Sequence, residues 1–528
     1  MCYFLGAMEL VIAEKPSVAR DLARVLGARP AEKGAYEGGG RVITWCVGHL
    51  VELDEPAAYD GRWKAWRLDT LPMLPAEFKL RPAKHAADQL KRVVGLLRER
   101  RFTSVVNACD AGREGELIFR YVLQYAGRTP PVKRLWISSL TDEAIRRGFA
   151  SLKPAAQFDA LGDAARARSE ADWLVGMNAT RAITVRLRDG GGDTLFSIGR
   201  VQTPTLAMLV AREQAIRQFV PRDYWEARGT FTTAERERFT ARWSHAGNAR
   251  LGTAALADTL VARANDHKSA ADVDGPRVAR VRSQTVHEPP PQLFDLTSLQ
   301  RTANRRFGFS AQRTLDLAQA LYERHKLLTY PRTDSRHLTS DVARELPSHF
   351  AGLADVDEYA PFVARLQANP PRPNRRIVDD AKVSDHHAII PTGKTPSLDK
   401  LDRDERRLFD LVVRRFLGVF FPDAQFAVTD VLVRVGAVTT QPPAIATPTA
   451  TKNADESADD EAPHTTLPPP PDWFATRGRV RLLAGWQEVA GLDDEPRGRH
   501  APGDDVAANV LPPLVEGQPL DGTFAAQS

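Results

Sequence analysis

"FTSVVNACDAGREGELIFRYVLQYAG", residues 102–127, changes within a few residues from the pattern of a buried strand to that of a helix. Three carboxylates, those of Asp110, Glu114 and Glu116, lie at the junction. Carboxylates in such a position indicate a metal site, an acid/base pair or a solvated polar loop. This stretch alone leaves the three interpretations open.

Strand and helix patterns alternate throughout residues 8–150, where MELVIA, RVITWC and VKRLWIS predict further strands. Such alternation is typical of a parallel sheet, whose strands present their carboxyl ends at one edge. Glu14 and Lys15 directly follow one of these strands, just as Asp110 follows another. Glu114 comes shortly after. We therefore expect these four side chains to lie close together.

The composition predicts a soluble protein of several domains, because 528 residues are too many for one core. No apolar stretch approaches the roughly 20 residues that span a bilayer, and the N-terminus lacks the features of a signal peptide. Three scattered cysteines favour a reducing cytoplasm and exclude a four-cysteine zinc ribbon in this chain. The net charge of +5 is modest support for a polyanionic partner.

LLTYPRTDS, residues 327–335, places Tyr330 before a proline, which keeps it out of a helix. Arg332 lies two residues on, so both side chains point to the same side of an extended segment. A phenol with a guanidinium beside it can attack a phosphorus centre while the cation balances charge on the phosphoryl oxygens. A tyrosine that simply packs at a helix exit is the alternative.

SIGRVQTPTL, residues 197–206, offers backbone and side-chain donors to phosphate groups. Arg181, Arg186 and Arg188 lie upstream and add a basic face. The alternative is a solvated arginine-rich helix.

SDHHAIIPT, residues 384–392, holds two adjacent histidines. In an extended chain they point in different directions, so one metal is not expected to bind both. A contact from one histidine to a phosphate or hydroxyl is one interpretation, and a structural role is the other.

AEKPS, residues 13–17, and CDAGREGE, residues 109–116, together supply the groups for a divalent ion. Mg²⁺ prefers a few carboxylates plus water and phosphate oxygens to a cage made only of protein. A phosphate-binding P-loop is not supported, because no Gly-Lys-Ser/Thr follows the glycines. A solvated acidic loop is the alternative.

Taken together and in this order, these motifs resemble those of type IA DNA topoisomerases, and within that family the bacterial topoisomerase III group. The resemblance covers roughly residues 8–395, with weaker similarity to about 515. It rests on the segments MELVIAEKPSVAR, VITWCVGHLVEL, DAGREGELI, ARSEADWLVGMNATRA, SIGRVQTPTLAMLV, LLTYPRTDS and DHHAIIPT.

The resemblance implies a multidomain fold of α/β, α and β parts. It begins with a Toprim domain built on a Rossmann-like parallel sheet, and a toroid of helical and β domains follows. The expected domains are 8–150 (Toprim), 151–218 (helical, DNA-binding, first part of the ring base), 219–285 (β-rich arch, first part), 286–398 (helical, carrying the nucleophilic tyrosine), 399–500 (β-rich arch, return, with a disordered insertion at 438–472) and 501–528 (truncated return to the ring base).

The resemblance also implies an ATP-independent enzyme that relaxes negative supercoils or decatenates DNA with the help of Mg²⁺. Tyr330 would cut one strand and become linked to its 5′-phosphate, another strand would pass, and the break would be resealed. The residues that match family positions or are further candidates are, for catalysis, Tyr330, Lys15, Arg332, Glu14 and His386; for Mg²⁺, Glu14, Asp110 and Glu114; and for DNA, Trp66, Trp173, Arg181, Arg188, Ser197, Ile198, Gly199, Arg200, Val201, Gln202 and Arg332.

Two departures from the family pattern matter. Gly112 stands where the family's Asp-x-Asp-x-Glu pattern has its middle acid, so either Glu116 compensates or Glu14, Asp110 and Glu114 hold the ion with waters. The stretch that completes the ring in the family is also missing after LPPLVEGQPL, which raises a second hypothesis, a truncated single-strand DNA-binding remnant without full turnover. A third, a Toprim primase or nuclease, does not explain LLTYPRTDS together with SIGRVQTPTL.

The expected partner is DNA that offers single-stranded segments, with a helicase as a candidate protein partner. No membrane, no ATP and no zinc are expected for this chain. We expect a monomer in the bacterial cytoplasm, associated with the nucleoid or with a mobile element.

Overall fold

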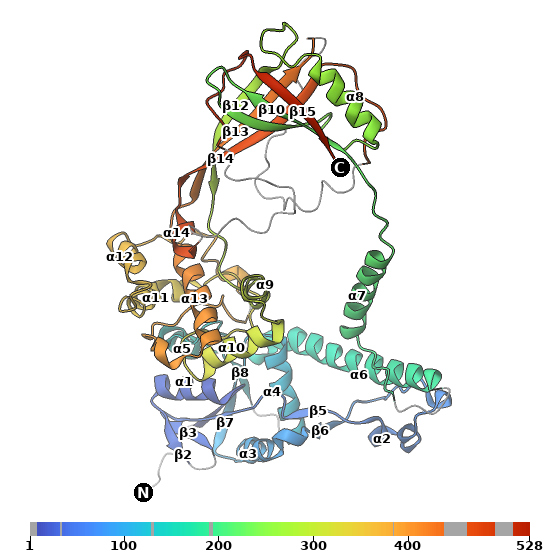
Figure 1. The fold of residues 1–528 in the computed structure, drawn as a ribbon. Helices are drawn as coiled ribbons and strands as arrows, with labels where there is room; N and C mark the ends of the chain where they lie inside the picture. Colours follow the sequence, from blue (N-terminus) through green and yellow to red (C-terminus); the bar gives the residue numbers. More distant parts are fainter. Residues whose placement is uncertain are drawn as a thin grey trace. The chain divides into compact units, whose positions relative to one another are not determined.

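The computed structural model describes residues 8–31, 34–127, 131–188, 194–383, 385–437, 462–491 and 510–528. The chain separates into two units, each made from two stretches of sequence. Unit 1 comprises residues 1–218 and 292–416, and unit 2 comprises residues 219–291 and 417–528. Figure 1 shows the helices and strands of both units.

Unit 1 begins with a seven-stranded sheet of order β2-β3-β4-β1-β7-β8-β9. Its strands are β1 Met8–Ala13, β2 Arg29–Ala31, β3 Ala35–Gly38, β4 Arg41–Trp45, β7 Phe102–Ala108, β8 Val132–Arg134 and β9 Lys153–Pro154. The central pairs β4–β1, β1–β7 and β7–β8 are parallel, and the outer pairs are antiparallel. The parallel sheet predicted from the strand-helix alternation is confirmed.

The helices of unit 1 are α1 Pro16–Leu26, α2 Pro56–Tyr59, α3 Ala87–Leu97, α4 Arg113–Ala126, α5 Asp142–Ala150, α6 Asp159–Leu187, α7 Gln202–Arg217, α9 Leu296–Phe307, α10 Ala311–Glu323, α11 Ser340–Ala351, α12 Ala360–Ala368 and α13 Arg403–Gly418, whose last two residues belong to unit 2. A two-stranded antiparallel sheet, β5 Val51–Leu53 with β6 Leu80–Pro82, also lies in unit 1.

Helices cover both faces of the sheet, because successive residues of a strand point to opposite sides. In β1, Leu10 and Ile12 pack in one hydrophobic cluster with residues of α3 and α4, whereas Val11 and Ala13 pack in another with residues of α1 and α5. All four side chains are fully buried, as a central parallel strand requires. Figure 1 shows α1 and α3 on different sides of the sheet.

The carboxyl ends of β1 and β7 lie side by side, because Ala13 pairs with Ala108 in the parallel register. The chain leaves β1 into α1, which begins with Pro16 at its first turn. It leaves β7 into α4, whose N-cap is Gly112. The residues in these two turns therefore meet at one edge of the sheet.

Unit 2 is built on a six-stranded antiparallel sheet of order β12-β13-β14-β11-β10-β15. Helix α8 packs on this sheet through Ala257, Leu260 and Ala264. The elements of unit 2 are β10 Glu226–Thr232, β11 Arg238–Trp243, α8 Ala254–Asn265, β12 Arg277–Glu288, β13 Ala424–Val435, β14 Asp472–Leu483, α14 Trp486–Ala490 and β15 Asp521–Gln527.

The structure moves two of the expected domain boundaries. Residues 399–416 stay in unit 1, because the apolar face of α13 packs there, with Phe416 5.5 Å from Phe350 between ring centres. Residues 521–527 form β15 and pair with β10 in unit 2, where Phe524 lies 5.7 Å from Phe231 between ring centres. They are thus part of the β-rich unit and not of the base.

Most of the insertion that we expected to be disordered, residues 438–461, lies outside the described residues. Residues 462–472 instead lie against the sheet of unit 2. The Asn248 side chain donates a hydrogen bond to the carbonyl of Ala462 at 3.0 Å, and Asp472 begins β14. Across the parts of the chain that the structure describes, no helix combines the length and apolar character needed to cross a membrane.

Candidate active site

Two carboxylates and an ammonium group meet where β1 and β7 end. The Lys15 Nζ lies 2.6 Å from Asp110 Oδ2 and 3.2 Å from Glu14 Oε1. The backbone N–H of Asp110 donates a hydrogen bond to Glu14 Oε2 at 3.2 Å. These are three of the four side chains that the strand pattern predicts to lie together.

The segment that carries Tyr330 reaches this edge of the sheet through backbone pairing with residues 388–392. The N–H of Thr329 donates to the carbonyl of Ile390 at 3.0 Å, and the N–H of Thr392 donates to the carbonyl of Leu327 at 2.9 Å. This pairing places Tyr330 beside the histidine motif, although more than 50 residues separate them in sequence.

Tyr330 is enclosed by groups from both parts of unit 1. Its ring centre lies 4.4 Å from that of His386 and 5.4 Å from that of Tyr322. The Lys15 Nζ lies 4.5 Å from the same ring centre. His386 Nε2 in turn lies 3.3 Å from Asp110 Oδ2, so the tyrosine and the acid pair form one site.

The two adjacent histidines diverge, as their extended setting predicts. His386 faces Asp110, whereas His387 Nδ1 lies 2.8 Å from the carbonyl oxygen of Ala388. Burial lowers the pKa of His387 to about 4, so this ring is neutral at physiological pH. Only His386 is placed to act on a substrate.

The charges of the site control one another's pKa values. Burial raises the pKa of Glu14, and the Asp110 carboxylate raises it further. Burial by itself would lower the pKa of Lys15, but Asp110 and Glu14 reverse this and raise it above its usual value. Burial would also raise the pKa of Asp110, yet His386 and Lys15 hold it well below its usual range. The site therefore keeps Lys15 charged and Asp110 ionised beside a Glu14 that takes up a proton more readily than usual.

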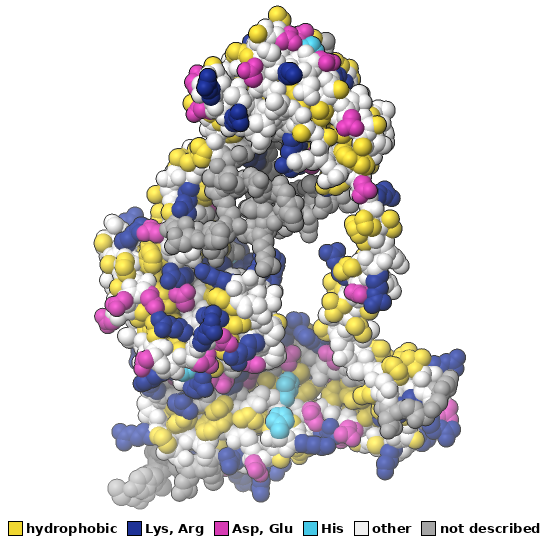
Figure 2. Space-filling view, viewed as in Figure 1, with side chains coloured by type: hydrophobic (Ala, Val, Ile, Leu, Met, Phe, Trp, Pro, Cys, Tyr) yellow, Lys and Arg dark blue, Asp and Glu magenta, His cyan; other side chains and the backbone are white. Residues whose placement is uncertain are grey.

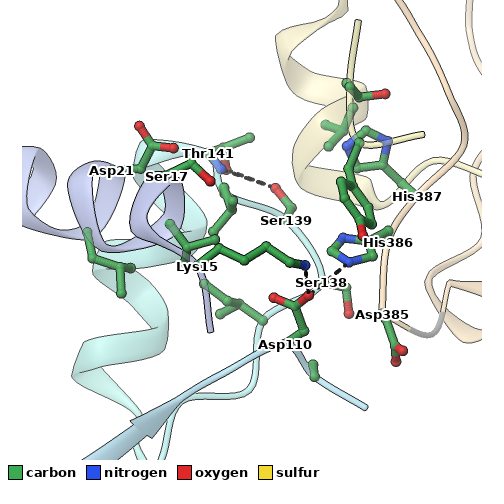
Figure 3. A pocket seen from close by; sticks show the side chains of 18 of the residues that line it. Lys15, Ser17, Asp21, Asp110, Ser138, Ser139, Thr141, Asp385, His386 and His387 are labelled. Atoms are coloured by element: carbon green, nitrogen blue, oxygen red, sulfur yellow. Dashed lines mark hydrogen bonds and ion pairs between the residues drawn. The ribbon is translucent and has the colours of Figure 1, made fainter. Parts of the chain in front are cut away.

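A cavity of about 490 Å³ lies within unit 1 at this site. Figure 3 shows Lys15 and His386 reaching Asp110 from different elements, with Asp385 on the same segment as His386. A cavity of this size admits a nucleotide-sized group. Its lining includes Lys15, Ser17, Ser139, Tyr322, Tyr330 and His386.

Glu114 and Glu116 take different places from those expected. The Glu114 side chain is 60% exposed and lies 3.3 Å from His49 Nε2. Glu116 is buried and lies 3.1 Å from Arg134 Nε and 2.8 Å from Arg120 Nε. Glu116 is therefore committed to structural ion pairs, and it does not replace the acid missing at position 112.

Residues that could hold Mg²⁺ are Glu14 and Asp110, which present two carboxylates to one cation, the Lys15 ammonium. Within the described ranges no three His, Cys, Asp or Glu side chains are grouped as ligands of one ion. A site with few carboxylates still fits Mg²⁺, which completes its shell with waters and phosphate oxygens.

The segment 197–202, expected to contact DNA, runs along α6. The N–H of Ile198 donates to Thr180 Oγ1 at 2.9 Å, and the N–H of Phe196 donates to Thr184 Oγ1 at 3.1 Å. Residues four apart lie on one face of a helix, so these threonines hold the extended segment against α6.

The side chains of this region are mostly at the surface. Val201 is 61% exposed, and Arg200 Nε donates to Asp172 Oδ1 at 2.6 Å. Arg188 Nε donates to the carbonyl of Thr194 at 3.2 Å. The following helix, α7, has no buried residue, and Figure 2 shows hydrophobic and basic side chains together along it. These two arginines can bind the phosphates of a nucleic acid only by giving up their present bonds to Asp172 and Thr194.

Trp173 does not fit the expected role of stacking on DNA bases, because it is a core residue. It is 6% exposed, and its Nε1–H donates to the carbonyl of Asp54 at 2.9 Å. Tyr59 and Phe78 pack edge-on against it, at 5.4 and 5.5 Å between ring centres.

Trp66 keeps an exposed face, whereas Arg181 is buried. Trp66 is 39% exposed, and the Arg181 guanidinium lies 5.1 Å from its ring centre. Arg181 also donates to the carbonyl of Trp63. Arg181 therefore supports the tryptophan and is not itself a backbone contact.

The two tryptophans should respond differently to truncation. Trp173→Ala is expected to destabilise unit 1 by about 3–5 kcal/mol, because it leaves a large cavity. Trp66→Ala should leave the stability nearly unchanged and weaken single-stranded DNA binding by about tenfold through the loss of one stacked base. Urea unfolding and fluorescence anisotropy with a labelled oligonucleotide measure the two effects. Equal loss of DNA affinity in both variants, with unchanged stability, would contradict the assignment.

Sequence reasoning missed two residues of the site. Asp385 lies in the histidine motif but carried no prediction of its own, and its carboxylate contacts the N-cap of α4. Arg134 is 1% exposed and donates to the backbone carbonyls of Cys109 and Asp110 at 2.7 and 2.6 Å. A single arginine inside the apolar strand VKRLWIS was the available signal for it.

Two family models match the chain, the Toprim domain over residues 9–140 and DNA topoisomerase over residues 156–464. The chain therefore belongs to the DNA topoisomerase family, in the type IA class that joins these two parts.

Its relatives include DNA topoisomerase 3 of Bacillus cereus, 40% identical over 515 residues, which cover 97% of this chain and 63% of the relative. DNA topoisomerase 3 of Shouchella clausii is 45% identical over 424 residues, 80% of this chain and 56% of the relative. The chain thus spans less than two thirds of the length of these relatives. The full-length topoisomerase I of Thermotoga maritima shares the fold, with a TM-score of 0.58 at 19% identity, covering 98% of this chain and 72% of that one.

Proposed function

We propose that this chain cuts one DNA strand through Tyr330, holds the break as a phosphotyrosine ester and reseals it after strand passage, without ATP. The observation that carries the proposal is the meeting of Tyr330, Lys15, His386 and Asp110 in one cavity.

The cleavage step exchanges one phosphodiester for another. The Tyr330 oxygen attacks phosphorus, the P–O3′ bond breaks, and the 5′-phosphate stays bonded to the tyrosine. The phenol loses its proton and the leaving 3′-oxygen gains one. Because the bond energy is kept in the new ester, the 3′-hydroxyl can attack it and restore the strand without an external energy source.

Lys15, Glu14 and Arg332 divide the remaining tasks. The Lys15 ammonium stabilises negative charge on the phenolate and on the phosphoryl oxygens. Glu14, whose pKa burial and Asp110 raise, is the candidate to hand a proton to the leaving 3′-oxygen. Arg332 is exposed two residues after the nucleophile, where it can meet the scissile phosphate.

His386 and Asp110 position the nucleophile. His386 packs on the Tyr330 ring and contacts Asp110, so it links the tyrosine segment to the Toprim edge. Mg²⁺, held by Asp110 and by Glu14 once Glu14 has given up its proton, would neutralise phosphate charge and keep the cut ends in register. Glu114 could reach that ion only by leaving His49.

The proposed substrate is DNA with single-stranded segments, either negatively supercoiled or catenated. Segment 197–202 and the exposed faces of Trp66 and Arg188 are the candidate contacts to single-stranded DNA. We also propose that the protein works as a monomer in the bacterial cytoplasm near the nucleoid or a mobile element, with a helicase as partner.

The proposal is tested by incubating the chain with 5′-truncated, labelled single-stranded DNA and denaturing it with SDS. A covalent adduct should form with the wild type and be absent with Tyr330→Phe, while Tyr322→Phe, its neighbour in the same cavity, should still form it. If the wild type binds the oligonucleotide but gives no adduct, the chain is a DNA-binding protein without turnover. Relaxation of negatively supercoiled plasmid with Mg²⁺ then measures the complete cycle.

A further inference from the structure

Gly112 has a neighbour that takes up the space of its missing side chain. A Cβ atom built on Gly112 would lie 2.3 Å from Asp385 Oδ2 and 2.6 Å from Asp385 Oδ1. The backbone of Gly112 is extended (φ −153°), so any residue could adopt its conformation. The Asp385 carboxylate therefore fills the space that a side chain at position 112 would need.

Gly112 is also the position at which the family's acidic pattern has a carboxylate and this chain has none. The Asp385 carboxylate lies against Gly112, at the N-terminus of α4 and two residues along the chain from Asp110. Its electrostatic neighbours are Asp110 and Asp334 on the acidic side and His386 and Arg113 on the basic side. A carboxylate is thus present at this place in space, although it comes from a distant part of the sequence.

We propose that Asp385 replaces the carboxylate missing at position 112, as a group that binds Mg²⁺ through a coordinated water. The inference rests on the proposed function only in placing the ion at Glu14 and Asp110. Among the described residues no three His, Cys, Asp or Glu side chains are grouped as direct ligands of one ion, and Mg²⁺ commonly keeps several waters, so a third carboxylate suits its outer shell.

Because Asp385 lies on the segment that packs against Tyr330, Mg²⁺ binding would also affect the position of that segment. Asp385 directly precedes His386, which packs on Tyr330, so the carboxylate moves with the nucleophile segment and not with the Toprim loop. An acid at position 112 would stay on the Toprim loop in every conformation. In this chain the full set of acids exists only while the tyrosine segment contacts the Toprim edge, and Mg²⁺ therefore favours that contact.

The test exchanges the carboxylate between the two positions in the full chain and titrates Mn²⁺, followed by its EPR signal. Asp385→Ala is expected to weaken Mn²⁺ binding by about tenfold. Gly112→Asp alone should also bind weakly, because its side chain overlaps Asp385. The double variant Asp385→Ala/Gly112→Asp should recover binding to within about threefold of the wild type.

The matched control is Asp399→Asn, an exposed aspartate on the same part of unit 1, which should bind Mn²⁺ as the wild type does. Asp385→Asn keeps the shape of the side chain and should show the loss of affinity without loss of thermal stability. Wild-type affinity in Asp385→Ala and Asp385→Asn, or a double variant no tighter than Asp385→Ala, would overturn the inference. If Asp385 only caps α4, Asp385→Asn should change neither the Mn²⁺ affinity nor the thermal stability by much. That outcome would also overturn the inference.

Hydrogen exchange tests the coupling to the tyrosine segment. Mg²⁺ should increase protection of residues 386–390 in the wild type, whereas in the exchanged variant it should bind without that increase. Equal protection in both would contradict the coupling. The Tyr330 adduct assay, run without divalent ions, tests the proposed function separately. An adduct together with unchanged Mn²⁺ binding in the Asp385 variants would overturn this inference alone.

Discussion

Replacing Lys15 by methionine is expected to lower the rate of adduct formation with single-stranded DNA by a factor of about 10²–10³, the usual cost of losing one preorganised charge in an active site. Methionine keeps the length of the side chain and removes only the cation. Without it the phenolate of Tyr330 and the phosphoryl oxygens lose a positive charge that lies 4.5 Å from the tyrosine ring centre. Single-turnover cleavage of a labelled oligonucleotide measures the rate.

The same variant should bind Mn²⁺ at least as tightly as the wild type, because Lys15 neutralises Glu14 and Asp110 and competes with a metal for them. Slower cleavage together with equal or tighter Mn²⁺ binding would show that the Lys15 charge acts in catalysis. Loss of a structural charge would weaken both. Lys133→Met is the matched control, since Lys133 forms an ion pair with Glu9 at 2.7 Å on the same sheet but away from the site. Cleavage by Lys15→Met within a factor of three of the Lys133→Met rate would refute the role of Lys15.

Arg134→Met is expected to destabilise the Toprim sheet by about 3–5 kcal/mol, the range for breaking a buried ion pair from one side. The guanidinium is 1% exposed and donates from Nη1 and Nη2 to the carbonyls of Asn107, Cys109 and Asp110 at 3.1, 2.7 and 2.6 Å. Without it the buried Glu116 carboxylate, 2% exposed, keeps among the described residues only Arg120 as a cationic partner for its negative charge. Because the turn that bears Asp110 also loses its donors, adduct formation should fall as well.

The chain has two units, so one unfolding midpoint does not describe it, and hydrogen exchange of residues 102–118 gives the local measurement. Arg120→Met is the control, because Arg120 also pairs with Glu116, at 2.8 Å, but is 32% exposed and should cost much less. Adding Glu116→Met to Arg134→Met should restore part of the stability by removing the unpaired charge. Unchanged exchange in Arg134→Met would show that these contacts do not hold the turn.

The acid pair with its lysine was predictable because it depends on a general property of parallel sheets. Strands that enter helices at one edge bring the following residues together, and Glu14, Lys15 and Asp110 follow adjacent strands. The nucleophile was different: Tyr330 and His386 were each ambiguous in their own segments. They were grouped only by resemblance, because the backbone pairing that joins residues 327–329 to 390–392 leaves no local pattern.

Side-chain direction was the main thing that the sequence could not specify. Glu114 and Glu116 are two residues apart on a helix and therefore point to nearly opposite sides, but which of them is buried depends on tertiary partners such as Asn107 and Arg134. Trp173 lies in an arginine-rich helix, and a tryptophan among arginines is typical of a DNA contact. Its burial depends on Tyr59, at the end of α2, and on Phe78, both far from Trp173 in sequence.

The edge strand β15 has a consequence for folding during synthesis. Every strand of the Toprim sheet lies within residues 8–154, so that sheet can assemble while translation of the chain continues. In unit 2, Glu226 pairs with Gln527, and β10 remains an open edge until β15 has emerged from the ribosome. Until then this half-built sheet is the surface that a chaperone would have to shield.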